Sequence, residues 1–272
     1  MKIYGGSNLS FLSKLAPYRE VGGRKIRLWN QLIFVGVIYA GYEYTSSLAS
    51  GSKSTAQANA LTEVHIEKFL HIFSEQSIQN YVIEHAIWLI KAADLYYTTV
   101  HFILPVVVFA LLFGKYARRY LVWRNTMILL NLMALVVFIV LPVMPPRLLP
   151  HAYGFVDTQA VYGGAGTLDA TLMKDAGNLY AAMPSLHMAW ALWCTFSIVA
   201  AVKNRLGKVL LLLHPIITIF VVVVTANHFW LDIIMGFVDF YLAYFISGGR
   251  RLEFWNEKGV FSEINAIEQS FL

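Results

Sequence analysis

Long apolar segments recur along this chain and are separated by shorter polar stretches. Six of them have about the length, roughly 20 mostly apolar residues, that a transmembrane helix needs. These segments are Leu28–Leu48, Leu95–Phe113, Thr126–Met144, Leu186–Val202, Val209–Thr225 and Phe229–Ser247. The pattern predicts an all-α protein: a polytopic membrane bundle of six transmembrane helices that forms one domain over residues 1–272, without an internal repeat.

The first apolar segment has a second interpretation as a signal peptide, because it ends in the small-residue stretch Ser47-Leu48-Ala49. The basic region before it covers residues 1–27, however, whereas the basic region of a secretory signal is short. We therefore favour a retained membrane helix.

The positions of the basic residues test this count of helices, because cytoplasmic loops are enriched in Lys and Arg. If the N-terminus is cytoplasmic, only five of the 21 basic residues fall outside: Lys53, Lys68, Lys91, Arg147 and Lys174. The distribution predicts that both termini are cytoplasmic. Residues 1–27 and 248–272 then lie inside the cell, and the segments 49–94 and 145–184 lie on the periplasmic, extracellular or lumenal side.

Composition agrees with a membrane protein. The chain is 58% hydrophobic and 14% charged, whereas an average soluble domain is about 25% charged. These values exclude a disordered chain, a collagen and a coiled coil, and they disfavour a soluble enzyme. The single cysteine, Cys194, excludes an intrachain disulfide and a cysteine-based zinc site, and we expect it to be buried.

The first outer segment, residues 49–94, contains an amphipathic pattern. Apolar residues recur at helical spacing, at Ile66, Phe69, Leu70 and Phe73. Glu63 precedes this series and Glu67 falls within it. This spacing predicts a helix with one apolar face. The helix either lies on the membrane surface or packs over the bundle, and the pattern does not separate the two.

The second outer segment, residues 145–184, begins with Pro145-Pro146-Arg147. The prolines stop the preceding helix and stiffen the turn, so that Arg147 is held at the membrane edge. A guanidinium group suits a phosphate, because it combines permanent charge with two parallel hydrogen bonds. The alternative is an arginine that only meets lipid phosphates.

The fourth apolar segment opens with Pro184-Ser185-Leu186-His187. A proline fits the start of a helix, where free N–H groups favour an anion. Ser185 can donate a hydrogen bond to that anion, and His187 can gain or lose a proton near neutral pH. Taken alone, His187 is equally open to a structural interpretation.

The stretch Thr225–Asp232, which opens the sixth apolar segment, carries His228 and Asp232. These residues are four apart, which predicts that they share one helix face. A carboxylate that accepts the proton of one ring nitrogen leaves the other nitrogen as a nucleophile or base. A simple helix-end ion pair is the alternative. All three polar sets fall on the outer side, and together they indicate a phosphoryl-transfer site.

At these residues the sequence resembles the type 2 phosphatidic acid phosphatase superfamily. Its three signatures are K-x6-R-P, P-S-G-H and S-R-x5-H-x3-D. Arg147 matches the arginine of the first signature, residues 184–187 match the second, and His228 with Asp232 matches the end of the third.

The chain departs from these signatures at four positions. Val140 and Val222 replace the lysine and the second arginine, Leu148 replaces a proline, and Leu186 replaces a glycine. Two phosphate-binding cations are therefore missing from their usual places, and Lys174 is a candidate replacement for one.

The departures point to one branch of the superfamily. Over about Asn125–Gly236 the motifs look like the inositol phosphotransferase branch, which includes fungal inositol phosphorylceramide synthase. The similarity extends weakly to the amphipathic pattern and to Tyr96-Tyr97-x3-His101-Phe102.

The resemblance implies a covalent phosphohistidine mechanism. His228 would be the nucleophile, Asp232 would orient it, and His187 would act as general acid and base. Arg147 and Ser185 would bind the phosphate oxygens. Further candidates for the substrate pocket are Lys174, His101 and Asn227, although His101 is also explained as a packed histidine. No metal and no cofactor is expected.

Three functions remain open at this point. A site with one motif arginine favours a singly charged diester, and hence transfer of a phospholipid headgroup, such as phosphoinositol, between lipids. A lipid or polyprenyl phosphate phosphatase would use the same residues with water as the acceptor. A transporter, or a lipid-binding scaffold, is the alternative that is not an enzyme. The expected partners are a lipid phosphate and the bilayer rather than nucleic acid, and the oligomeric state is open.

Overall fold

The computed structural model describes residues 18–21, 24–48, 51–162 and 178–248. A short antiparallel hairpin, β1 (Tyr18–Val21) and β2 (Arg24–Arg27), precedes a mostly helical chain. The helices are α2 (Leu28–Leu48), α3 (Lys53–Phe69), α4 (Glu75–His85), α5 (Ile87–Lys115), α6 (Ala117–Val140), α7 (Thr158–Tyr162), α9 (Leu186–Ile198), α10 (Arg205–Val224) and α11 (Trp230–Ile246). Two 3-10 turns, η1 (Pro146–Leu148) and η2 (His151–Tyr153), follow α6.

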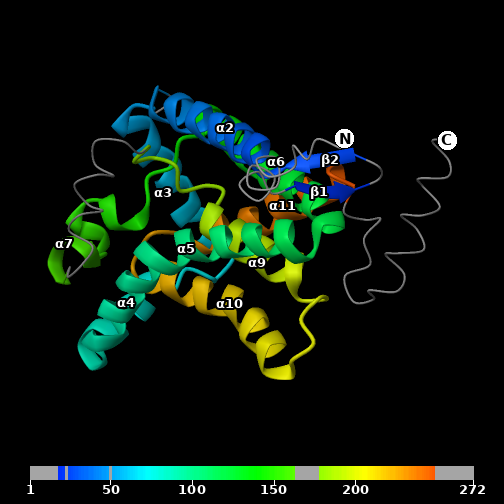
Figure 1. The fold of residues 1–272 in the computed structure, drawn as a ribbon. Coiled ribbons are helices and arrows are strands. Elements are labelled where there is room, and N and C mark those ends of the chain that lie inside the picture. The colour runs from blue at the N-terminus through cyan, green and yellow to red at the C-terminus, as the bar shows by residue number, and fades with distance from the viewer. Residues whose placement is uncertain (1–17, 22–23, 49–50, 163–177, 249–272) are drawn as a thin grey trace, which may run out of the picture.

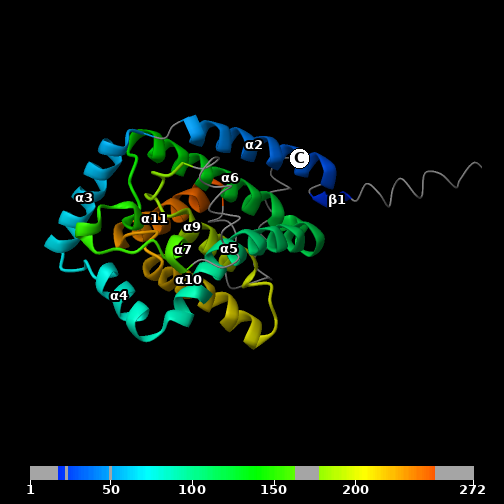
Figure 2. The ribbon, with the colours of Figure 1, turned by 90° about the vertical axis from the view of Figure 1, so that its left-hand side faces the viewer.

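Helix α9 lies at the centre of the bundle. It packs against α5, α6, α10 and α11, while α2 lies along the outer side of α6 (Figures 1 and 2). A helix that is apolar all round belongs in an interior, and most of α9 is buried. Trp193 is fully buried, and its indole N–H donates to the carbonyl oxygen of Trp123 on α6 at 2.7 Å. Cys194, the neighbour of Trp193, is buried as predicted.

Three helices are long and apolar enough to cross a bilayer, namely α5, α10 and the part of α6 from Arg119 to Val140. They confirm the character of an integral membrane protein. The other three predicted spans form helices, but they stay predictions as membrane crossings. Helix α9 has 13 residues, which at 1.5 Å per residue gives a length of about 20 Å.

Two predicted helix ends are wrong. Helix α6 ends at Val140 rather than at Met144, because Pro142 disfavours the helical conformation of the residue before it. Helix α9 ends at Ile198 rather than at Val202, and a turn follows.

The outer segments gather at one end of the bundle. Helices α3, α4 and α7 lie there, opposite the β1–β2 hairpin (Figure 1). The backbone N–H of Met144 donates to Ala56 O at 3.1 Å, and Val143 pairs with Ala181 in a parallel bridge. The fully buried Gln79 of α4 donates to the carbonyl oxygens of Val156 and Val224. The segments 49–94 and 145–184, which the sequence placed on the same side of the membrane, thus contact each other where they are described. Which side of the membrane they lie on stays a prediction.

The amphipathic pattern lies in and just after helix α3, but the predicted helix does not reach Phe73. The helix ends at Phe69, since His71 adopts a left-handed conformation with φ 58°. Its buried residues are Ala56, Ala60, Glu63, Val64 and Glu67. The apolar stripe of Ile66, Phe69 and Leu70 is exposed instead. Contact between this stripe and the membrane surface stays a prediction.

Helices α9 and α11 approach each other closely at Gly236. A Cβ atom there would lie 2.5 Å from the carbonyl oxygen of Ser185 and 3.1 Å from Cβ of Met188. The absence of a side chain therefore allows the start of α9 to lie against α11. By contrast, a Cβ at Gly41 of α2 would meet nothing within 4 Å.

We expect Gly236→Ala to lower the stability of the protein by about 1–3 kcal/mol, because overpacking forces the backbones apart. Thermal unfolding in detergent measures the effect. Gly41→Ala is the matched control, and it should leave the midpoint unchanged or raise it, since alanine favours a helix. Equal midpoints for Gly236→Ala and the wild type would show that the close approach is not needed.

Candidate active site

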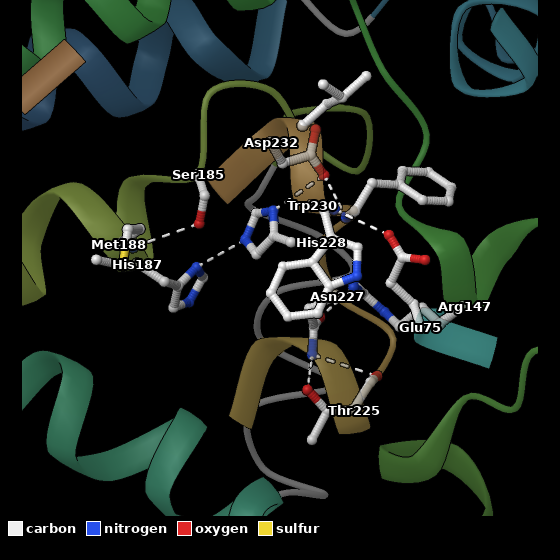
Figure 3. A network of polar contacts seen from close by, with 12 residues as sticks. Glu75, Arg147, Ser185, His187, Met188, Thr225, Asn227, His228, Trp230 and Asp232 are labelled. Atoms are coloured by element: carbon white, nitrogen blue, oxygen red, sulfur yellow. Dashed lines mark hydrogen bonds and ion pairs between the residues drawn. The ribbon is translucent and has the colours of Figure 1, made fainter. Parts of the chain in front are cut away.

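Three side chains form a hydrogen-bonded row near the start of α11 (Figure 3). Nδ1 of His228 lies 3.3 Å from Oδ2 of Asp232, and Nε2 of His228 lies 3.1 Å from Nδ1 of His187. Because a carboxylate only accepts, the proton on Nδ1 of His228 faces Asp232. Nε2 of His228 then carries a lone pair and accepts from Nδ1–H of His187. The row predicted for His228 and Asp232 is present, and His187 extends it.

Carboxyl groups from three helices satisfy the start of α11. The backbone N–H of Phe229 donates to Oδ2 of Asp232 at 2.8 Å. The backbone N–H of Trp230 donates to Glu75 of α4 at 2.9 Å. The backbone N–H of Leu231 donates to Glu67 of α3 at 2.8 Å. Such N–H groups have no partner within their own helix, so acids from outer helices hold the start of α11 in place.

Glu67 is a protonated acid in this arrangement. Burial, together with a hydrogen bond to Glu75 and the negative charge of that group, raises the pKa of Glu67 to about 9. At neutral pH Glu67 therefore donates its proton toward Glu75 while its other oxygen accepts from Leu231. Two fully buried carboxyl groups thus lie side by side without two full charges.

Ser185 begins α9 and joins it to α11. Its hydroxyl oxygen accepts from the backbone N–H of Met188 at 3.3 Å, and its own N–H donates to the carbonyl oxygen of Asp232 at 2.9 Å. The predicted helix start at Pro184-Ser185 is therefore correct. Ser185 is fully buried and caps the helix, so its role as a phosphate ligand stays a prediction.

Arg147 reaches the third motif from the second outer segment. Its guanidinium group donates to the side-chain oxygen of Asn227, and its backbone N–H donates to Ala226 O at 2.9 Å. The amide nitrogen of Asn227 in turn donates to the hydroxyl of Thr225 at 2.7 Å. The turn before α11 thereby fixes the position of the cation (Figure 3).

A cavity of about 310 Å³ opens beside these residues. Its wall includes Arg147, His187, Asn227, His228 and His101. Among the described residues of the wall, Arg147 is the one lysine or arginine. A volume of this size accommodates a phosphate with part of its substituent, next to a permanent cation and two imidazole rings.

Aromatic rings hold His187 in place. Its ring stacks on Tyr97 with a centroid distance of 4.3 Å, and it lies 4.0 Å from the ring of His101 one helical turn along α5. His101 stacks in turn on Trp190 at 4.7 Å. Both interpretations of His101 therefore apply, because it lines the cavity and also packs against His187.

The structure brings together most of the residues that the sequence singled out: Arg147, Ser185, His187, Asn227, His228, Asp232 and His101. Lys174 lies outside the described residues. Sequence reasoning missed Tyr97 as a neighbour of His187, and it placed Glu67 on the polar face of a helix. The spacing of Glu63 and Glu67 with Ala56, Ala60 and Val64 was the available signal for a buried face.

Valines occupy the two positions at which the family signatures have a lysine and a second arginine, and they differ in burial. Val222 is fully buried in the hydrophobic core of the bundle, although its carbonyl oxygen accepts from the N–H groups of Asn227 and His228. Val140 is exposed at the end of α6. Within the described part of the chain, no three His, Cys, Asp or Glu side chains are arranged to hold a metal ion. Among the described residues of the cavity wall, the permanent positive charge thus comes from Arg147.

We expect Arg147→Gln to weaken binding of inorganic phosphate by about 10- to 100-fold, since a hydrogen bond to a charged group contributes about 1.5–3 kcal/mol. Phosphorus NMR titration of the detergent-solubilised protein measures this affinity. Arg205→Gln, at an exposed position at the start of α10, is the control and should bind as the wild type does. Unchanged affinity in Arg147→Gln would exclude this guanidinium as the anion ligand.

Comparison with known proteins places this site in a family. Neither curated proteins nor solved structures gave a match to the chain. A family profile described as the PAP2 superfamily matches residues 63–246, a range that includes all three motifs and both helices α9 and α11. The match supports a membrane-embedded enzyme of the phosphatase kind with lipid phosphates as substrates. The chain therefore belongs to the PAP2 superfamily.

Proposed function

We propose that this protein transfers the phosphoryl group of a phospholipid or another lipid phosphate through a covalent phosphohistidine, at the outer end of its bundle. The observation that carries the proposal is the row Asp232–His228–His187, whose histidines line a cavity together with Arg147. This arrangement combines an oriented nucleophile, a second proton carrier and a permanent cation.

In the first step Nε2 of His228 attacks phosphorus. The N–P bond forms, the P–O bond to the leaving group breaks, and His187, which enters this step protonated on both ring nitrogens, gives one proton to the leaving oxygen and becomes neutral. Asp232 keeps the Nδ1 proton of His228 and stabilises the charge of the phosphorylated ring. Because the two histidines are in direct contact at 3.1 Å, the entering phosphoryl group replaces their hydrogen bond.

In the second step the oxygen of an acceptor hydroxyl attacks the phosphohistidine. The N–P bond breaks, the new P–O bond forms, and the hydroxyl proton passes to His187, which restores the starting state. Arg147, the N–H groups at the start of α9 and the hydroxyl of Ser185 hold the equatorial oxygens. This scheme uses groups of the protein alone.

The charge of the site favours headgroup transfer between lipids, as in the inositol phosphotransferase branch that the motifs resemble. A phosphate monoester carries nearly two negative charges, whereas a diester carries one. The burial of Val222 in the apolar core supports a site with one motif arginine. Hydrolysis by water, which makes the enzyme a lipid phosphate phosphatase, is the second candidate, and the family match favours it.

His228→Ala should abolish phosphoryl transfer, with a fall in kcat of at least about a thousandfold, because loss of the nucleophile removes the covalent route. Protein that is given a radiolabelled lipid phosphate and quenched in alkaline detergent, which preserves the N–P bond of a phosphohistidine, should carry label in the wild type and none in the variant. His151→Ala, at an exposed histidine of η2, is the control. Full transfer activity in a folded His228→Ala protein would exclude His228 as the nucleophile, whereas a folded wild type without any phosphoryl transfer would favour the transporter or the scaffold.

Headgroup transfer should exceed hydrolysis when the protein is given a phospholipid diester and a lipid alcohol in mixed micelles. Mass spectrometry quantifies the new headgroup lipid, and a colorimetric assay quantifies free phosphate in parallel reactions with a monoester. Rapid hydrolysis of the monoester without any transfer product would identify a phosphatase and contradict the headgroup-transfer proposal.

A further inference from the structure

Four acidic side chains surround the outer start of α11: Glu63 and Glu67 from α3, Glu75 from α4, and Asp232 from α11 itself. All four are buried. Glu67, Glu75 and Asp232 accept from backbone N–H groups of α11. Helix capping therefore explains three of the four acids, but it does not explain Glu63.

Glu63 lies against the free side of Asp232. Its carboxyl group is within hydrogen-bonding reach of the carboxyl group of Asp232. Both oxygens of Glu63 and Oδ1 of Asp232 are buried and have no hydrogen-bond donor. If both carboxyl groups were ionised, all three of these atoms would stay without a donor. One proton shared by the pair gives one oxygen of Glu63 and Oδ1 of Asp232 a common hydrogen bond, since it makes one group the donor and the other the acceptor. The second oxygen of Glu63 then lacks a donor, but in a neutral carboxylic acid it carries no charge.

The proton belongs on Glu63. Oδ2 of Asp232 already accepts from the N–H of Phe229 and from His228, and such donors favour the charged form of a carboxyl group. Glu63 has no donor of this kind. Burial, followed by the charge and the hydrogen bond of Asp232 and then by the charges of Glu67 and Glu75, raises the pKa of Glu63 to about 11.

We propose that Glu63 is a positioning residue, which donates its carboxylic O–H to Oδ1 of Asp232 and so keeps Oδ2 directed at His228. The inference rests on the proposed function, because it acts through the nucleophile of that reaction. With Oδ1 held by Glu63 and Oδ2 by Phe229, the carboxylate of Asp232 is fixed at both oxygens. The ring of His228 is then kept in the tautomer whose lone pair faces the cavity.

Cation binding does not account for this cluster. No three of the His, Cys, Asp and Glu side chains in the described ranges are arranged as ligands of one metal ion. The oxygens of Glu67 and Glu75 that face α11 are also occupied by N–H groups of Leu231 and Trp230. Besides Oε2 of Glu67, the buried oxygens of these four acids that lack a hydrogen bond are those of Glu63 and Oδ1 of Asp232.

Steady-state kinetics with a lipid phosphate substrate test the proposal. Glu63→Gln keeps a neutral donor of similar size, and it should retain at least about half of the wild-type kcat. Glu63→Leu leaves Oδ1 of Asp232 buried without a donor, so kcat should fall by about 10- to 100-fold with KM changed less than about twofold. In Glu63→Asp the side chain is too short for its carboxyl group to reach Oδ1 of Asp232, so its kcat should fall as in Glu63→Leu. This variant replaces Glu63→Leu in the test if Glu63→Leu does not fold.

Two controls separate positioning from a general loss of structure. Val64→Ala removes a buried side chain next to Glu63 on the same helix, and it should lower the unfolding midpoint without lowering kcat. Glu84→Gln removes an exposed acid of α4 and should change neither. A wild-type kcat in Glu63→Leu, or a Glu63→Gln variant as slow as Glu63→Leu, would overturn the positioning role in an otherwise active enzyme. A wild-type protein without phosphoryl transfer would overturn the proposed function together with it.

The protonation of Glu63 is tested without any activity. In the unfolded chain Glu63 ionises above its usual pKa of 4.5, whereas the folded protein keeps it protonated up to about pH 11. Ionisation of the unfolded chain therefore lowers the stability of the wild type as pH rises through this window. Glu63→Gln removes that loss and leaves the facing groups Asp232, Glu67 and Glu75 in place.

The unfolding midpoint of Glu63→Gln should thus exceed that of the wild type at pH 8, and the difference should narrow toward pH 5. Thermal scans of both proteins in the same detergent measure it. A midpoint of Glu63→Gln that is equal to or below the wild type at pH 8 would show that Glu63 is ionised in the folded protein, and it would overturn the proposal.

Discussion

One carboxylate oxygen connects the fold of this protein to its chemistry. Oδ2 of Asp232 accepts the first free N–H of α11, from Phe229, and it also faces Nδ1 of His228. The oxygen that caps the helix is therefore also the oxygen that orients the ring of His228, the proposed nucleophile. Any movement of the start of α11 would turn the imidazole ring, so the packing of α11 against α9 at Gly236 belongs to the active site as much as to the core.

Burial of this helix start explains why acids are found so deep in an apolar protein. In water, solvent would satisfy the free N–H groups at the start of a helix. Here Glu75 and Glu67 accept from Trp230 and Leu231 in place of water, and both acids are fully buried. Helices α3 and α4 thereby support the site from outside the core bundle, and the protonated form of Glu67 limits the repulsion between their carboxyl groups.

Contacts within the protein also hold Arg147 and His187 in fixed positions. Arg147 is held by Asn227 through its side chain and by Ala226 through its backbone, so a cation from the second outer segment reaches the turn before α11. His187 is held differently, by stacking on Tyr97 and His101 of α5. Fixed rings and a fixed guanidinium group reduce the reorganisation that a reacting phosphate would otherwise require.

Local spacing predicted much of this site correctly. The four-residue spacing of His228 and Asp232 predicted their contact, although His228 lies just before α11 rather than on its face, and Pro184-Ser185 predicted a helix start. The same reasoning was wrong at the end of α6, where Pro142 was counted as part of an apolar segment. It also could not identify the buried face of α3. An apolar stripe faces either protein or lipid, and Ile66, Phe69 and Leu70 are exposed in the structure while Glu63 and Glu67 are buried.

The sequence by itself determined the membrane class, the starts of α2 and α9 and the residue types of the proposed chemistry, because these depend on composition and on contacts within one helical turn. Only the tertiary structure decided that His187 meets His228, 41 residues away, and that Glu63 lies against Asp232. Those contacts depend on how α3, α9 and α11 pack against one another. No local spacing encodes them, since each is made across a helix interface whose geometry is set by small residues such as Gly236 and by the hydrogen-bonding needs of a buried helix start.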